Sequence, residues 1–246
     1  MINNPRIRRQ FGKACGDFRL INSEDIILIP MDSDGPSLSL CAWLQYKVTK
    51  MPQRPTLVGA HFHSTTEPCP ETVSLLNQYI EKFPISIHYV QCNLPTSQSD
   101  LFRTYCDNAL KHGCNKVAVA DTLDFLNAQT LGNMFTEGVF NGPPAVQNIQ
   151  ISPEAKEISI IRPLCYVTDD ELASFSQKNG FPSHPTSIRI EEPKHVTVAR
   201  EAVNYMSTEA NNIRMNIFHS QFAIQEKYLG TGDGKVHNIA DACEEC

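Results

Sequence analysis

Residues 25–37, DIILIPMDSDGPS, decide the fold of this chain. The run DIILIP is short and continuously apolar, as expected for a strand that is buried on both faces. Turn-forming residues follow it, and a helix is predicted from about Ser37 to Val48. Pro36 suits the start of this helix, because the N–H that proline lacks would be unpaired there anyway. A buried strand, a turn and a helix form the first half of a βαβ unit.

The same alternation continues along the chain. Thr168 is predicted to cap the start of a late helix, and Gly180 to lie just past its end. Residues 139–155, with their prolines and glycines, are predicted as loop. Further strands are predicted at residues 56–62, 85–92, 116–120 and 158–164. Strands that alternate with helices form a parallel sheet with right-handed crossovers. The predicted fold is α/β, a Rossmann-like, doubly wound parallel five-stranded sheet with a C-terminal helical extension.

Four segments are expected along the chain. They are an N-terminal helix over residues 1–22, an α/β domain over 23–185, a helical segment over 186–230 and a tail over 231–246. The tail has no apolar period, and we expect it to be flexible.

Composition places the chain among ordinary globular proteins, with 246 residues, 41% hydrophobic residues and a net charge of −6. The negative charge argues against nonspecific binding to nucleic acid. One basic cluster, Arg6, Arg8, Arg9 and Lys13, is either a solvated helix face or a patch that faces phosphate. No signal peptide or apolar stretch of about twenty residues is visible. The nine cysteines are therefore expected to be reduced thiols of a cytoplasmic protein without a membrane partner.

Ligands of such sheets bind at the carboxyl ends of the strands, where residues 32–37 (DSDGPS) lie. The stretch IPMDSDGPS resembles the first motif of haloacid-dehalogenase-type phosphatases, with Asp32 as nucleophile and Asp34 as acid/base. A later GDG at residues 232–234 has no strand before it, so it does not return easily to the sheet.

The same loop also resembles the Ser-Gly-Gly-x-Asp-Ser loop of the PP-loop family, which cradles the phosphates of ATP. One alignment keeps Ser37, and another keeps Ser33 and Gly35. The carboxylates of Asp32 and Asp34 oppose an anion at the helix N-terminus by about 1 kcal/mol each. A bound Mg²⁺ would reverse this effect, because it binds both carboxylate and phosphate oxygens.

Three further segments, residues 7–21, 116–138 and 160–182, resemble the tRNA 2-thiocytidine synthetase branch of the PP-loop family. They contain RRQFGKACGDF, a strand and helix ending in NMFTEG, and IRPL followed by a helix and Gly-Phe-Pro. Within the second segment the matching residues are Lys116, Ala118, Asp124, Asn133, Met134, Phe135 and Gly138. Because the three segments match in order, the resemblance favours this family over the phosphatases.

The resemblance implies an ATP site and a set of partners. ATP would be bound by Ser33, Asp34, Gly35 and Ser37, with Asp124 near a Mg²⁺. A cytidine of tRNA would be adenylated and then thiolated, with sulfur supplied by a sulfur-carrier protein. The possible partners are therefore tRNA, this carrier and a second copy of the chain in a homodimer.

The departures from the family fall on its chemistry, and no catalytic residue is assigned. Asp121 and Thr122 stand where the family has two histidines, and Phe125 where it has a second Asp. The two Cys-x-x-Cys motifs are replaced by LPTS at residues 94–97 and SHPTS at residues 183–187. No iron–sulfur cluster is therefore expected at the family position, because these side chains do not replace thiolates. The alternative function is a non-catalytic paralogue that binds a small molecule, an RNA or a protein.

Two other groups of metal-ligating residue types are present. His61 and His63 end a predicted strand, with Glu67 and Cys69 nearby. They indicate either a transition-metal site or a pair of partly exposed histidines. The terminal pair Cys243 and Cys246 indicates metal binding, redox exchange or two exposed thiols.

Overall fold

The computed structural model describes residues 4–182, 188, 190–210 and 212–228, and for residues 222–228 it describes the backbone alone. The chain divides into two compact units. The first comprises Met1–Asp121 and Ala145–Glu191, and the second comprises Thr122–Pro144 and Glu192–Cys246.

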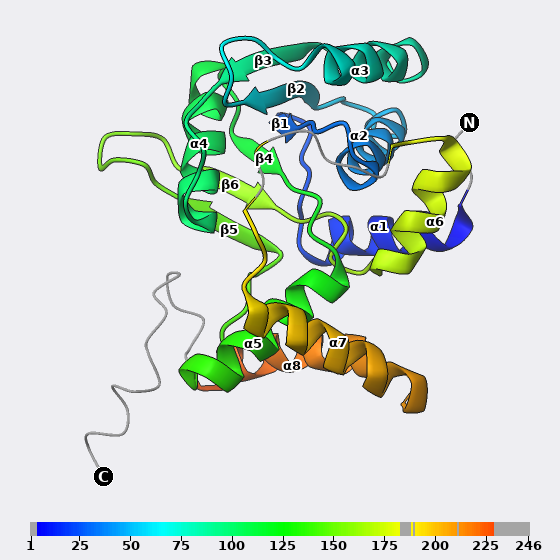
Figure 1. The fold of residues 1–246 in the computed structure, drawn as a ribbon, viewed down its shortest axis with the longest axis vertical. Coiled ribbons are helices and arrows are strands. Elements are labelled where there is room, and N and C mark those ends of the chain that lie inside the picture. The colour runs from blue at the N-terminus through cyan, green and yellow to red at the C-terminus, as the bar shows by residue number, and fades with distance from the viewer. Residues whose placement is uncertain (1–3, 183–187, 189, 211, 229–246) are drawn as a thin grey trace. The chain divides into compact units, whose positions relative to one another are not determined.

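The first unit is built on a six-stranded sheet with the strand order β3-β2-β1-β4-β6-β5 (Figure 1). Every strand pair is parallel except β5 with β6. The order reverses between β1 and β4, and this reversal is where sheets of this kind bind ligands. The strands are β1 (Ile26–Pro30), β2 (Thr56–His63), β3 (Ile87–Gln91), β4 (Lys116–Ala118), β5 (Val146–Ile149) and β6 (Ile158–Ile161).

The five predicted parallel strands and the Rossmann-like fold are confirmed. The prediction of loop over residues 139–155 was wrong in part, because Val146–Ile149 forms the antiparallel edge strand β5. Its sequence, VQNI, is short and carries two amides, and none of its four residues is fully buried. An edge strand with so little apolar pattern gives a weak signal in sequence.

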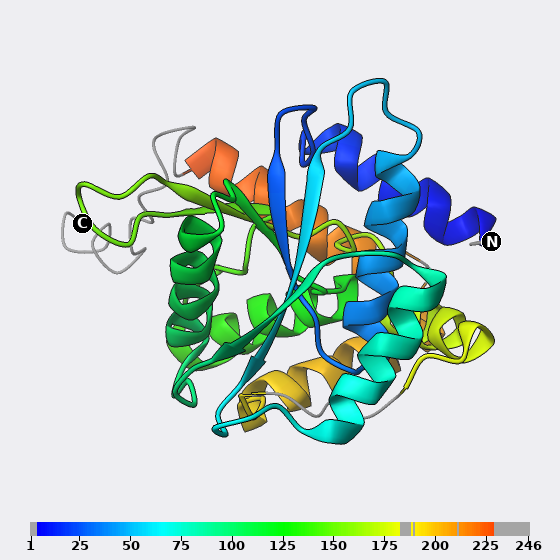
Figure 2. The same cartoon turned by 90° about the horizontal axis from the view of Figure 1, so that it is seen from above.

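Helices cover both faces of the sheet (Figure 2). α4 contacts β1, β4 and β6 on one face, and α2 lies on the other with α1 and α6 packed against it. The helices of this unit are α1 (Pro5–Asp17), α2 (Gly35–Val48), α3 (Pro70–Lys82), α4 (Gln98–Lys111) and α6 (Asp169–Asn179). The predicted ends of α6 are confirmed: Thr168 forms a capping box with Glu171, and Gly180 is left-handed at φ 69°.

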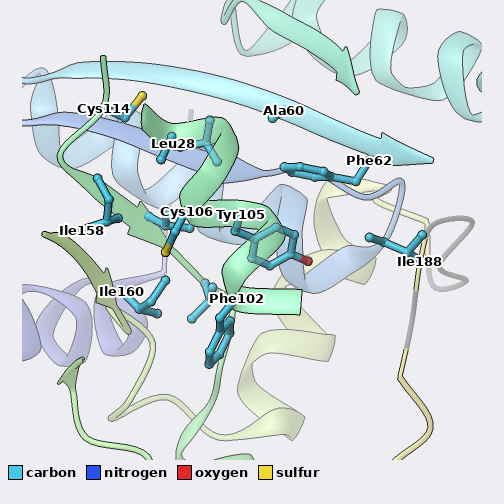
Figure 3. Close-up of a cluster of buried hydrophobic side chains, with 13 residues drawn as sticks. Leu28, Ala60, Phe62, Phe102, Tyr105, Cys106, Cys114, Ile158, Ile160 and Ile188 are labelled. Carbon is cyan, nitrogen blue, oxygen red and sulfur yellow. The ribbon is translucent and has the colours of Figure 1, made fainter. Parts of the chain in front are cut away.

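The core between α4 and the sheet is a cluster of buried apolar side chains (Figure 3). Phe102, Tyr105 and Cys106 of α4 meet Leu28 of β1 and Phe62 of β2. The rings of Phe62 and Tyr105 lie 4.9 Å apart. This packing holds Tyr105 of α4 beside Phe62, which lies near the carboxyl end of β2.

The second unit contains three helices, α5 (Leu123–Glu137), α7 (Lys194–Glu209) and α8 (Ile213–Tyr228). Leu131 of α5 packs against Ala199 and Val203 of α7. The single helical stretch predicted over residues 194–229 is interrupted, because Ala210 is extended and Asn212 is left-handed at φ 66°. None of the helices in the described residues is long and apolar enough to span a membrane.

Candidate functional site

The loop after β1 is closed by its own hydrogen bonds. Asp34 is the N-cap of α2, and its Oδ1 accepts a hydrogen bond from the Ser37 backbone N–H at 2.9 Å. The Ser37 hydroxyl donates to the Asp32 carbonyl at 2.7 Å, and the Asp32 N–H donates back to that hydroxyl at 3.1 Å. Ser33, Asp34 and Ser37 are all buried. The sequence-predicted residues of this loop therefore lie together in one turn.

The first turn of α2 does not fit a bare phosphate. The Ser37 N–H is bound by the Asp34 carboxylate, and the Leu38 N–H donates to the Asp34 carbonyl at 3.2 Å. Pro36 has no N–H to offer. A phosphate would have to displace a carboxylate that already compensates the positive end of the helix dipole.

Gly35 is required by packing within the first unit. A Cβ at this position would lie 2.8 Å from the Ser176 Oγ of α6 and 3.2 Å from the Pro182 carbonyl oxygen. The absence of a side chain therefore lets α2 begin directly against α6. This contact accounts for the glycine without any ligand.

A second carboxylate, Asp121, follows β4 and replaces a family histidine. The Nε of Arg162, which follows β6, donates to its Oδ2 at 2.8 Å. Arg162 is 0% exposed, donates also to Gln147 Oε1 at 3.1 Å, and its guanidinium lies 5.4 Å from the Phe102 ring centre. Burial raises the pKa of Asp121, and the charge of Arg162 offsets part of that rise.

Tyr105 of α4 is affected by the acidic residues at these strand ends. Its pKa is raised, first by burial and then by the negative charges of Asp32 and Asp121, with a smaller effect from Asp34. The phenol therefore stays protonated near neutral pH. The ends of β1 and β4 thus bring several carboxylates near a neutral hydroxyl, and one of them, Asp121, is balanced by Arg162.

His61 and His63 point to one face at the end of β2, as the strand period predicts, and their rings stack with centres 6.2 Å apart. The expectation that they are partly exposed was wrong, because they are 1% and 7% exposed. The Nδ1 of His61 is 2.8 Å from the Met31 carbonyl oxygen, and that of His63 is 2.9 Å from the Thr65 carbonyl oxygen. Burial lowers the pKa of His61, so its neutral ring supports the chain directly before the loop.

Across the described residues, no group of three or more His, Cys, Asp or Glu side chains is arranged to hold a metal ion. Residues 94–97, at the family's first Cys-x-x-Cys position, lead into α4, and the Ser97 hydroxyl accepts the Asp100 N–H at 3.1 Å. Residues 183–187, the GDG at 232–234 and the Cys243/Cys246 pair lie outside the described residues. That an iron–sulfur cluster is missing from the family position stays a prediction.

Asp124 belongs to the second unit, where it lies in the first turn of α5 and is 4% exposed. Its carboxylate forms an ion pair with the Nε of Arg214 from α8. Arg214 also donates to Asn204 Oδ1 at 2.7 Å, and its carbonyl accepts from Asn127 Nδ2 at 2.8 Å. Sequence reasoning missed Arg214, because no local signal connects two residues that are ninety positions apart.

No protein-family model matches the chain. The tRNA-cytidine(32) 2-sulfurtransferase of Stenotrophomonas maltophilia is 25% identical over 199 residues, which are 74% of this chain and 63% of that protein. The protein of the same name from Klebsiella pneumoniae subsp. pneumoniae is 26% identical over 208 residues, 76% of this chain and 63% of its own length. The chain resembles the tRNA 2-thiocytidine synthetases of the PP-loop superfamily.

A solved structure supports the fold of this PP-loop-like chain. The U34-tRNA thiolase NcsA from Methanococcus maripaludis, solved with its [4Fe-4S] cluster, superposes with a TM-score of 0.70 over 97% of this chain and 86% of its own. At 14% identity this likeness establishes the architecture alone. The chain spans 63% of the length of the curated relatives quoted above, so their activity is not carried over with the resemblance.

The positions at which this PP-loop-like chain departs from the family have structural partners of their own. Asp121 pairs with Arg162 in the first unit, and the Thr122 hydroxyl accepts the Phe125 N–H at 3.3 Å at the start of α5. The residues that replace the two histidines of the family motif therefore form hydrogen bonds within this chain. The roles of Ser33, Asp34, Gly35, Ser37 and Asp124 in nucleotide binding stay predictions.

Proposed function

We propose that the chain is a cytoplasmic tRNA-binding relative of the 2-thiocytidine synthetases that does not itself thiolate tRNA. One observation carries the proposal: the carboxylate of Asp34 occupies the N-terminus of α2, where this family binds phosphate. A chain that cannot hold the phosphates of ATP cannot adenylate a cytidine. Without adenylation, sulfur from a carrier protein has no activated carbon to attack.

The choice of tRNA as partner rests on the relatives, whose names give a tRNA cytidine as the residue that they modify. The scaffold is retained, while two acids of the stretch that resembles the family motif have basic partners within the chain. Asp121 pairs with Arg162, and Asp124 pairs with Arg214. Retention of the scaffold without the chemistry is the expected pattern for a protein that binds the substrate of its relatives.

A second candidate function, Mg²⁺-dependent binding of ATP over residues 32–37, is favoured by the negative charge at the ends of β1 and β4. The charges of Asp32, Asp121 and Asp34 all raise the pKa of Tyr105, so each carboxylate contributes negative potential at the same phenol. A divalent cation would be attracted to them and could bridge to a phosphate. In that case the Asp34 carboxylate would have to give up its hydrogen bond from the Ser37 N–H in order to bind the metal ion.

The two candidates are separated by calorimetric titration of the full chain with ATP, with and without Mg²⁺. The first candidate, a tRNA-binding protein without ATP chemistry, predicts no binding heat at millimolar ATP with or without Mg²⁺. It also predicts saturable binding of unmodified tRNA, which fluorescence anisotropy measures. Micromolar ATP binding that requires Mg²⁺ and weakens in Asp34→Ala would establish the second. Absence of tRNA binding at tens of micromolar protein and moderate salt would refute the first.

A further inference from the structure

The first unit contains a small cavity lined by residues of α1 and of the C-terminal half of α2, two helices that contact each other. Its volume is about 180 Å³. Three aromatic side chains and three cations line it: Phe11, Trp43, Tyr46, Arg8, Lys47 and Lys50. None of these residues belongs to the candidate ATP site.

The three cations have no ion-pair partner among the described residues, whereas their neighbours do. Arg6 pairs with Glu171, and Lys13 pairs with Asp17. α2 contains no acidic residue, and Asp17 is the only one in α1. The cavity is therefore a positive region on a chain whose net charge is −6.

The aromatic side chains differ in exposure. Trp43 is 1% exposed and is fixed between Phe11 and Phe175, whose ring centres lie 6.2 Å and 5.2 Å from its own. Tyr46 is half-buried and meets Trp43 edge-on at 5.7 Å. Tyr46 is thus the aromatic side chain of the cavity that is not fully enclosed, and the Lys50 Nζ lies over its ring, 5.7 Å from the ring centre.

The indole Nε1 of Trp43 is buried and has no hydrogen-bond partner within the part of the chain that the structure describes. A buried indole N–H normally finds an acceptor, and leaving one unpaired costs about 1–3 kcal/mol. Because this nitrogen is itself shielded from solvent, Trp43 lines the cavity as a buried residue whose surroundings a bound ligand would alter.

The volume limits what the cavity can hold. Pockets for whole drug-sized ligands usually measure about 300–1,000 Å³. A cavity of about 180 Å³ therefore accepts one group of a larger molecule, with the remainder outside. Aromatic faces beside unpaired cations are the combination by which proteins bind single-stranded nucleic acid, with bases stacked on the rings and phosphates on the cations.

We propose that this cavity binds one unpaired nucleotide of an RNA strand, with the base against Tyr46 and the flanking phosphates on Arg8, Lys47 and Lys50. The inference rests on the proposed function, since it requires that RNA is a partner, and it adds the place and the mode of contact. Within the basic cluster of α1 it gives a phosphate-facing role to Arg8 alone, because Arg6 and Lys13 are paired with Glu171 and Asp17.

The fluorescence emission of Trp43 tests the proposal directly, because Trp43 is the only tryptophan in the sequence. The full chain is titrated with a short single-stranded oligoribonucleotide and, separately, with tripolyphosphate, which has charge but no bases. We expect the oligonucleotide to change the emission saturably and tripolyphosphate to leave it unchanged. Equal responses to both would overturn the proposal and leave an anion patch only.

Two variants separate stacking from charge. Lys47→Gln/Lys50→Gln should reduce the slope of log K against log salt by about 1.4, at about 0.7 for each phosphate contact on a single strand. The matched control is Lys82→Gln/Lys111→Gln, which removes two exposed lysines from the ends of α3 and α4 and should leave the slope unchanged. Tyr46→Leu should weaken the oligonucleotide by about tenfold without changing the slope.

The same variants are then measured with tRNA, after circular dichroism has confirmed that each is folded. Weaker tRNA binding by the cavity variants and not by the control supports the proposal. Unchanged tRNA binding in both cavity variants would overturn it while leaving the proposed function intact. A failure of every form of the protein to bind tRNA would overturn both.

Discussion

The carboxylate of Asp34 reaches across the first turn of α2 and accepts the backbone N–H of Ser37 at 2.9 Å. It therefore has two physical roles at once, as a helix cap and as a fixed negative charge. The two roles can be separated by substitution, since asparagine caps a helix as well as aspartate does but is neutral.

Asp34→Ala should lower the free energy of unfolding by about 1 kcal/mol through loss of the cap, whereas Asp34→Asn should change it by less than about 0.5 kcal/mol. If the charge is what excludes phosphate, Asp34→Asn should bind Mg²⁺-free ATP more tightly than the unsubstituted chain. Urea denaturation and calorimetry measure the two effects. Weaker binding of ATP by Asp34→Asn in the presence of Mg²⁺ would instead indicate a cation held by that carboxylate.

Arg162→Met should destabilise the chain by about 3 kcal/mol, because it leaves the carboxylate of Asp121, whose side chain is only 16% exposed, without its partner. Asp121→Asn in the same chain should restore part of the loss. The matched control is Lys13→Met, which removes an exposed pair with Asp17 and should cost less than about 1 kcal/mol. Equal losses at the two sites would mean that the buried pair is not structural.

The stability deficit of Arg162→Met should also depend on pH. Burial raises the pKa of Asp121, and removal of the guanidinium raises it further, so the folded variant holds a proton that the unfolded chain releases near pH 4. A raised acid pKa destabilises the folded state as pH rises above the unfolded value. The deficit should therefore shrink as pH falls from 7 toward 4, and a deficit that is constant over this range would contradict the assignment.

His61 should titrate below the usual histidine value of about 6.5, because burial disfavours its charged form. A lowered histidine pKa contributes stability above pH 6.5 that is lost as pH falls toward the folded value. NMR titration of the imidazole, assigned with His61→Asn, measures the pKa. A value at or above 6.5 would show that the ring is accessible to water or paired with an acid.

Gly142→Ala should destabilise the second unit by about 1–3 kcal/mol through overpacking. The added Cβ would lie 1.8 Å from Thr130 Oγ1 and 2.8 Å from Gln221 Oε1, two buried atoms that hydrogen-bond to each other at 3.0 Å. Gly16→Ala is the control, since nothing lies within 4 Å of its new Cβ and alanine favours a helix by about 0.5–1 kcal/mol. Thermal denaturation should move in opposite directions for the two variants.

The buried parallel strands could be predicted because each is a continuous apolar run followed by turn residues, as in Ile26–Pro30. The helix ends at Thr168 and Gly180 could be predicted from capping chemistry alone. The edge strand Val146–Ile149 could not, since half-exposed residues with amide side chains lack the period on which prediction depends.

The acidic residues near the strand ends could be identified from the sequence, but the basic residues that pair with them could not. The acids at 32, 34, 121 and 124 are evident, whereas their partners come from distant segments, as Arg162 does for Asp121 and Arg214 does for Asp124. Only the folded chain shows whether a carboxylate is available to a ligand or already neutralised. The burial of His61 was missed for a similar reason, because strand ends are usually wetter than this one.

The ion pair between Asp124 and Arg214 has a consequence for how this chain responds to its surroundings. A metal ion opposite Asp124 would come and go with its concentration in the cell and could be removed by a chelator. A guanidinium attached to α8 is always charged and cannot dissociate from the polypeptide. The charge of Asp124 is thereby balanced from the moment the second unit folds, and that balance does not depend on any supply of cations.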